Sequence, residues 1–171
     1  MLIEGLRNTD TRVANDEPVS PAFLFALLLW PAFCRSLITL QAQGVHAEEA
    51  QRRAADRVTL NQLRTIALPR RFSLPMQEIW LLQSRFGSRQ RKRVFRTLTH
   101  PRFRAAFDFL ALRQVASSEH EADIAFWREA QQQSGHELEA VLDAVHEEEG
   151  ECRGRRPRRR RRRRGAGAQA E

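Results

Sequence analysis

Apolar side chains recur at helical spacing along most of this 171-residue chain, and no stretch shows the sustained apolar and polar alternation of a half-buried strand. Proline, glycine and serine interrupt the pattern where helices are expected to begin or end. The sequence therefore predicts an all-α fold, an irregular multi-helix bundle. The expected helices cover residues 22–43, 46–68, 73–86, 88–100, 101–116, 121–133 and 136–149.

The first of these helices is the most apolar. Ser20 and Pro21 form a helix start, a capping hydroxyl followed by proline at the first helical position, and Gly44 ends the helix. Because residues 22–43 are apolar nearly all round, we expect this helix at the centre of the fold, bent at Pro31. Its most apolar run, PAFLFALLLWPAF, covers about a dozen residues, whereas a membrane helix needs about 20. Charges in every turn of MLIEGLRNTD argue against a signal peptide, so no transmembrane segment is expected.

Charge is unevenly distributed along the chain. Residues 64–104 hold eleven basic side chains and one acid, Glu78, whereas residues 119–149 hold ten acids and one arginine, Arg128. Residues 150–171 contain ten arginines and two glutamates, and they carry the whole net charge of +8. The sequence thus predicts a basic middle, an acidic segment after it, and a basic tail.

The tail sets the expected domain organisation. A run of arginine with glycine, alanine and proline cannot bury enough apolar surface to offset the entropy of ordering, so residues 150–171 are predicted to be disordered. Residues 19–149 are expected to form the helical body, and residues 1–18 a linker or a junction with another domain. Because guanidinium groups fit phosphate oxygens, nucleic acid is the favoured partner of the tail. An anionic lipid surface or an acidic protein is the alternative.

A second basic group lies on the helices expected within residues 73–116 and on their connections. Its cations either bind RNA or pair with the acidic helices of residues 119–149. Its interleaved rings, those of Phe72, Phe86, Phe95 and Phe103, either stack on unpaired bases or, as helical spacing favours, pack in the core. The candidate RNA-binding residues are Arg70, Arg71, Arg85, Arg89, Arg91, Lys92, Arg93, Arg96, Arg102 and Arg104 in the body, and Arg155, Arg156, Arg158, Arg159, Arg160, Arg161, Arg162, Arg163 and Arg164 in the tail.

Motifs that carry catalysis are missing from the sequence. It has no glycine-rich phosphate loop, no nucleophile elbow and no Asp-x-Asp pair that would hold two metal ions. His136 and His146 lie ten residues apart, whereas zinc-binding helices place paired histidines four apart. Cys34 has apolar neighbours and is expected to be a small core residue. No catalytic or metal-binding residue is therefore predicted, and with no disulfide framework a reducing, cytoplasmic setting is expected.

Four segments resemble, in the same order, the C-terminal part of bacterial poly(A) polymerases: NTDTRV, PVSPAFLFALLLWP, LPRRFSLPMQEIWLLQSRF and HPRFRAAFDFLALR. The likeness runs from residue 8 to residue 113 and resumes in the arginine tail. It implies an enzyme that adds adenylates to RNA 3′ ends, with ATP and Mg²⁺ held by a nucleotidyltransferase head. That head, with its Gly-Ser signature and metal-binding aspartates, has no counterpart in this sequence, so no catalytic residue is carried over.

The resemblance implies that the chain binds RNA backbone with little sequence preference and does not polymerise alone. ATP and Mg²⁺ are expected only in an enzyme that has the head. Further implied partners are RNA-decay proteins and the head itself, which would dock on an apolar patch around Leu2, Ile3 and Leu6. The alternative is a protein interaction module that a basic tail tethers to RNA or to an anionic surface.

Overall fold

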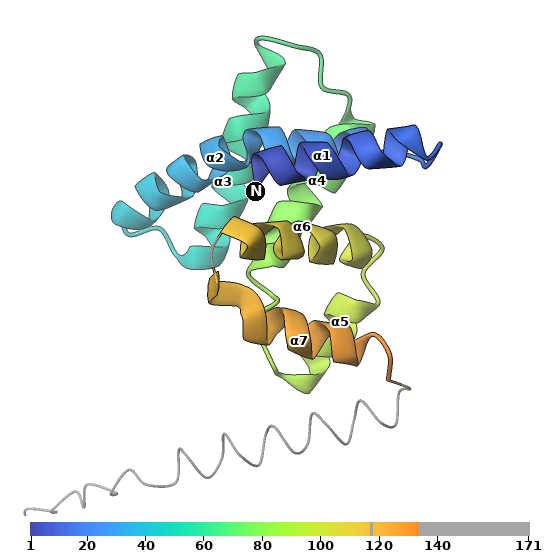
Figure 1. Ribbon diagram of the computed structural model, residues 1–171. Helices are drawn as coiled ribbons and strands as arrows, with labels where there is room; N and C mark the ends of the chain where they lie inside the picture. Colours follow the sequence, from blue (N-terminus) through green and yellow to red (C-terminus); the bar gives the residue numbers. More distant parts are fainter. Residues whose placement is uncertain (117, 134–171) are drawn as a thin grey trace, which may run out of the picture.

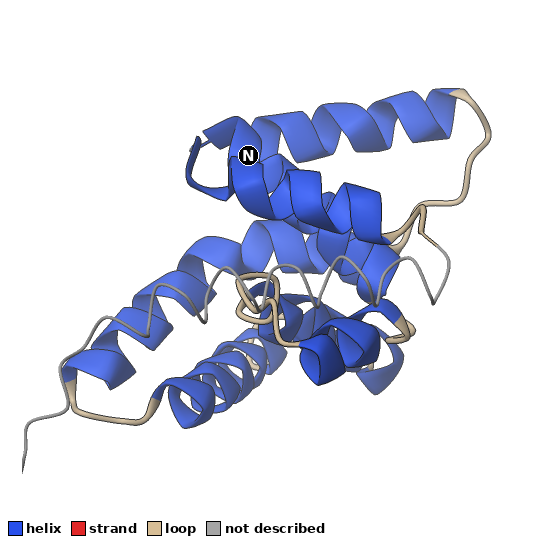
Figure 2. Ribbon diagram, turned by 90° about the horizontal axis from the view of Figure 1, so that it is seen from below, coloured by secondary structure: helices blue, strands red, loops and turns tan. Residues whose placement is uncertain are grey.

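The computed structural model describes residues 1–116 and 118–133, and all the regular structure of this part is helical (Figure 2), which confirms the all-α prediction. The expected helix at residues 136–149 and the arginine tail lie outside the described residues. The described elements are α1 (Leu2–Ala14), α2 (Pro21–Ala42), α3 (Ala47–Leu63), α4 (Arg70–Gln83), α5 (Arg91–Leu98), α6 (Phe103–Ala116), the 3-10 helix η1 (Ser118–His120) and α7 (Glu121–Ala130).

The helices pack around two hydrophobic cores that share α4 and α6. The upper part of Figure 1 contains α1, α2 and α3, the lower part contains α5 and α7, and α6 lies between them. Met76, Ile79 and Trp80 of α4 point into the first core, while Leu82 and the following Phe86 belong to the second. Because one helix has apolar residues on two sides, α4 joins the two halves of the molecule.

Helix α2 begins and ends where the sequence predicts. Ser20 is its N-cap and Pro21 its first residue, although the Ser20 hydroxyl makes no capping hydrogen bond. At the other end Gly44 adopts φ 80°, which is a left-handed conformation that glycine adopts without strain. The Gly44 N–H donates to the Gln41 carbonyl at 2.9 Å and the Val45 N–H to the Leu40 carbonyl at 3.1 Å, the two bonds of a Schellman motif.

The placement of α2 differs in part from the expectation. Ala26, Leu27 and Phe33 are buried, and the Trp80 indole donates to the Ala26 carbonyl at 3.1 Å, but Leu28 and Ile38 are 50% and 66% exposed. The helix also continues through Pro31, so α2 is long and apolar enough to cross a membrane by length and composition. The prediction that this apolar segment is too short to cross a membrane is therefore wrong. The assignment of α2 to the core rests instead on its packing against α3 and α4.

Several helix boundaries differ from the predicted ones: α4 and α7 end three residues early, and α5 and α6 begin three and two residues late. Two further differences have a clear cause. Helix α3 ends at Leu63 rather than at Leu68, because Leu68 leaves the helix and buries its side chain in the first core. Helix α4 begins one turn before Ser73, with Pro69 as N-cap, and Ser73 is buried within it. Pro75 has no N–H to donate to the carbonyl of Arg71, four residues earlier. It is tolerated inside α4 because Arg71 lies in the exposed first turn of the helix.

The sequence analysis assigned no helix to residues 1–18, and the structure contains α1 there. Gly5 is the buried residue of this helix, and a Cβ at that position would lie 2.6 Å from Leu27 Cδ1. The missing side chain thus lets α1 lie close against α2. Leu2, Ile3 and Leu6 remain 37%, 70% and 39% exposed, as the patch predicted for these residues requires.

Candidate nucleic-acid interface

Helix α5 presents one apolar and one basic side. Val94 and Thr97 are fully buried, and Phe95 and Leu98 pack partly against the second core. This leaves Lys92, Arg93 and Arg96, spaced three and four residues apart, exposed on the other side. We call these three residues the α5 basic face. The exposed Arg91 lies on the same helix.

The α5 basic face carries charge that is not neutralised locally. In residues 1–116 and 118–133, no carboxylate lies within ion-pair distance of Lys92, Arg93 or Arg96. Three adjacent cations of this kind repel one another, and an anion bound at the face would relieve the repulsion. The α5 basic face is therefore the part of the predicted basic group best placed to meet phosphates.

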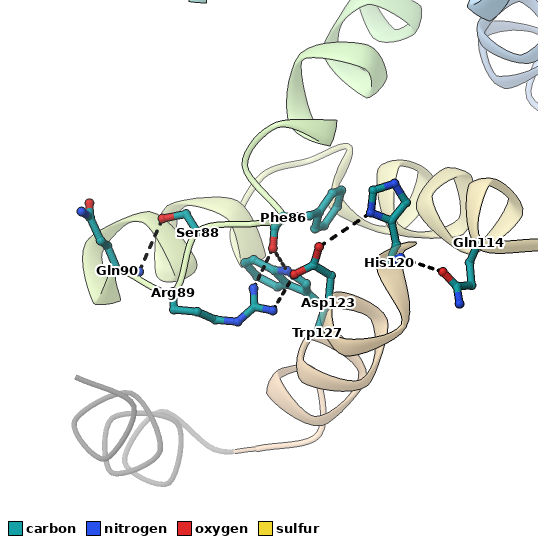
Figure 3. Close-up of polar contacts among 8 residues, drawn as sticks. All are labelled: Phe86, Ser88, Arg89, Gln90, Gln114, His120, Asp123 and Trp127. Carbon is teal, nitrogen blue, oxygen red and sulfur yellow. Dashed lines mark hydrogen bonds and ion pairs between the residues drawn. The ribbon is translucent and has the colours of Figure 1, made fainter. Parts of the chain in front are cut away.

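Arg89 has a different environment. Its guanidinium donates to Asp123 Oδ1 at 2.6 Å and to the Phe86 carbonyl at 2.7 Å (Figure 3). It also lies 4.1 Å from the centre of the Phe126 ring. The Arg89 and Asp123 side chains are only 18% and 24% exposed. The alternative that basic residues pair with the acidic helices thus holds for Arg89, which fastens α7 to the connection between α4 and α5.

The same junction contains further contacts between α7 and its neighbours. The Trp127 indole donates to the Phe86 carbonyl at 2.7 Å, so this carbonyl accepts from both Trp127 and Arg89. His120 Nδ1 lies 3.8 Å from Asp123 Oδ2, and the His120 backbone N–H donates to Gln114 Oε1 at 2.9 Å (Figure 3). These contacts form a polar shell around a buried aromatic core and hold α5 in place.

The other predicted cations lie on α4 and α6 and on the connections next to these helices. Arg102 pairs with Glu78 at 3.3 Å and Arg104 with Asp108 at 3.5 Å, all at least partly exposed, so both pairs are weak. Arg71 lies 4.8 Å from the centre of the Phe72 ring. Arg70 and Arg85 are exposed, without an ion pair in the described part of the chain. The candidate arginines of the tail lie outside the described residues.

The four interleaved phenylalanines divide into two groups. Phe86 and Phe103 are 1% and 7% exposed, which confirms the core interpretation for both. Phe72 and Phe95 are only partly buried. The Phe95 ring borders one groove with Leu98, Phe103 and Gln133 and a second with Lys92 and Arg96. It therefore combines an accessible aromatic surface with adjacent cations, the arrangement that stacking on an unpaired base requires.

Arg113 is a basic residue whose role the sequence analysis missed. Its guanidinium donates to the buried Gln83 side chain at 3.2 Å and lies 5.1 Å from the centre of the Trp30 ring. It follows the fully buried Phe109 by four residues, so helical spacing would have predicted that it points inward. Nearby, burial raises the pKa of the Cys34 thiol, as expected for a core cysteine rather than a nucleophile.

The described residues contain no group of three or more histidine, cysteine, aspartate or glutamate side chains that could hold a metal ion. The side chains that the surface of α5 offers to a ligand are guanidinium, ammonium and aromatic groups. These groups bind anions and bases by charge, hydrogen bonds and stacking.

Comparison with known proteins agrees with this chemistry. Residues 43–165 match the family model described as the arginine-rich C-terminus of polymerase A. Poly(A) polymerase I of Escherichia coli O6:H1 is 38% identical over 146 residues, which are 84% of this chain and 31% of the relative. The same enzyme of Salmonella typhimurium is 36% identical over 151 residues, 86% of this chain and 32% of the relative. Poly(A) polymerase I of Haemophilus influenzae is 33% identical over 144 residues, which are 83% of this chain and 32% of the relative.

The chain spans about a third of the length of these curated relatives. The family match begins near the end of α2 and continues into the arginine tail, so it includes α3 to α7 and the α5 basic face. The chain therefore belongs to the family of the arginine-rich C-terminal region of poly(A) polymerase.

Proposed function

We propose that this chain binds single-stranded RNA as the C-terminal part of a bacterial poly(A) polymerase and contributes to polyadenylation by holding the RNA rather than by catalysis. The observation that carries the proposal is the α5 basic face, three exposed cations without an acidic partner in the described residues. Membership of a poly(A) polymerase family supports RNA as the polyanion. Contacts to phosphate carry no sequence information, so binding has little sequence preference.

The arginines of residues 155–164 add affinity, and Arg70, Arg71, Arg85, Arg91, Arg102 and Arg104 extend the surface on either side of α5. We assign Arg89 to structure instead, because its guanidinium is largely buried and already donates to Asp123 and to the Phe86 carbonyl. ATP and Mg²⁺ act in the remaining two thirds of the relatives, so this chain by itself does not extend RNA. We further propose a cytoplasmic location and contacts with RNA-decay proteins.

Phe95 gives the proposal a sharper test. Because its ring borders both the α5 basic face and the neighbouring groove, an unpaired base stacks on the ring while its phosphates meet Lys92 and Arg96. A duplex hides its base faces, so the chain is expected to bind a single strand more tightly than a duplex of equal length. Phe95→Leu keeps the apolar contact and removes the ring, and it should weaken single-strand binding by about tenfold without changing duplex binding.

Fluorescence anisotropy with a labelled 20-nucleotide RNA, alone and annealed to its complement, measures both affinities. Phe107→Leu is a matched control, since Phe107 belongs to the same core but borders neither groove. Equal affinity for single strand and duplex would contradict the proposed stacking on Phe95 but not the proposed contacts with phosphate. Failure to bind either RNA at physiological salt would contradict the proposed function itself.

The exposed apolar residues of α1 favour a second function, docking of another polypeptide. Leu2, Ile3, Leu6 and Val13 recur at helical spacing on α1 and are 37% to 70% exposed, and Leu28 of α2 is half exposed. An exposed stripe of this kind is typical of an interaction surface. The relatives have about twice as much further sequence as the part this chain matches, and we propose that the stripe binds a segment of that remainder.

A dye that binds apolar surface tests this second function. The chain is expected to enhance the fluorescence of anilinonaphthalene sulfonate, and Ile3→Lys with Val13→Lys should abolish the enhancement while leaving the helical circular dichroism unchanged. Gln41→Lys on α2, which is exposed outside the stripe, serves as a control. A chain that is monomeric and binds no dye would count against a docking surface on α1.

A further inference from the structure

A polar groove runs between the C-terminal half of α2 and that of α3, in the half of the molecule opposite to α5 (Figure 1). Its volume is about 490 Å³, and its apolar floor includes the buried side chain of Val58. Its polar walls are formed by Arg35, Ser36 and Thr39 of α2 and by Arg57, Asn61 and Gln62 of α3.

The charge in this groove has one sign. Arg35 and Arg57 are exposed, and neither forms an ion pair with any residue the structure describes. No carboxylate is present among the residues that line the groove. Two guanidinium groups that share one groove repel each other, so an anion bound between them would be attracted by both.

Ser36 adds a second, independent observation. Its Oγ is inaccessible to solvent, and it has no hydrogen-bond partner in the part of the chain that is described. Serine and threonine inside helices commonly donate to the carbonyl four residues earlier, as Thr39 does to Arg35 at 2.9 Å. A buried hydroxyl without such a bond is rare, and rotation of the Ser36 side chain toward a ligand in the groove would break no hydrogen bond with the described residues.

We propose that this groove binds a phosphate group of a nucleotide or of an RNA strand. Arg35 and Arg57 supply the charged donors, the Ser36 side chain turns toward the groove so that its hydroxyl donates to a phosphate oxygen, and the amides of Asn61 and Gln62 meet the sugar or the base. The groove is open at its exposed rim, which suits a strand that passes through it. RNA as the source of the phosphate rests on the proposed function, whereas the phosphate chemistry of the groove does not.

The test follows the side-chain amide signals of Asn61 and Gln62 in nitrogen-15 NMR spectra of the full chain. The probes are 5′-AMP and a single-stranded oligouridylate of eight nucleotides. At least one probe is expected to shift these signals, and Arg35→Gln with Arg57→Gln should abolish the shift. Arg52→Gln with Arg53→Gln removes the same charge from α3 outside the groove and should leave the shift in place. Shifts with 5′-AMP identify a nucleotide site, and shifts with the oligonucleotide alone identify the RNA backbone.

Ser36→Ala separates binding from structure. Because the hydroxyl makes no hydrogen bond with any residue that the structure describes and alanine has the higher helix propensity, the melting temperature should stay the same or rise. The affinity for the probe should fall by about tenfold, the value of one hydrogen bond to a charged group. A lower melting temperature with unchanged affinity would overturn the proposal, and so would signals of Asn61 and Gln62 that neither probe moves. If the oligonucleotide shifts only signals of α5, the groove inference fails and the RNA-binding function stands.

Discussion

Replacing Trp127 by alanine is expected to lower the free energy of unfolding by about 3–5 kcal/mol. The indole is fully buried, meets the ring of Phe86 edge to face at 5.3 Å, and donates to the Phe86 carbonyl at 2.7 Å. The alanine variant loses these contacts and leaves a cavity in the second core, where α7 meets α4, α5 and α6. Since α5 packs on the same core, the variant should also lose part of its RNA affinity.

Urea unfolding followed by far-ultraviolet circular dichroism measures this loss. Trp127→Phe is the matched control, because it keeps the aromatic packing and removes the N–H. Arg89 still donates to the Phe86 carbonyl in that variant, so the acceptor is not left unpaired. The free energy of unfolding should therefore fall by only about 1–2 kcal/mol. An alanine variant no less stable than the phenylalanine variant would mean that α7 does not pack on this core.

Neutralising the α5 basic face is expected to weaken RNA binding about fiftyfold at 0.15 M salt. Each phosphate contact on single-stranded RNA contributes a slope of about −0.7 to the logarithm of affinity against the logarithm of salt, which is about fourfold in affinity at this salt concentration. The triple variant Lys92→Gln, Arg93→Gln, Arg96→Gln loses three contacts, so the slope should become shallower by about 2. All RNA sequences should be affected alike, because no base contact is removed.

Two controls separate the α5 basic face from general charge effects. Arg7→Gln, Arg52→Gln and Arg53→Gln remove the same charge from exposed positions on α1 and α3, and the slope should stay unchanged. Arg89→Gln should lower stability, since it leaves Asp123 partly buried without its partner, but should leave the slope unchanged. A triple variant that binds RNA like the unmodified chain would exclude α5 from the interface.

Local patterns in the sequence predict the basic face of α5 correctly. Val94, Phe95 and Leu98 mark the inward side at spacings of three and four, and the cations follow on the other side. The end of α2 at Gly44 is also predictable, because glycine adopts the required positive φ without strain.

Features that depend on distant residues were not predictable in this way. Arg89 lies in the same basic segment as Arg93, and only its contact with Asp123, 34 residues later, distinguishes it. Helix α1 has no inward apolar side that would have marked it as part of the body, because its apolar stripe is exposed and its contact with α2 depends on the absence of a side chain at Gly5. The groove between α2 and α3 joins Arg35 and Arg57 across two helices, and neither residue is part of a basic run.

The central claim is that the helical body and the arginine tail both bind RNA. Its most direct test is to measure RNA affinity as a function of salt, for the full chain and for a chain that ends at Gly150. The full chain is expected to give a steep slope. Removal of the tail arginines should reduce that slope by several units but leave about 2, the contribution of the α5 basic face. A slope near zero after truncation, or no binding by the full chain at physiological salt, would contradict the shared interface.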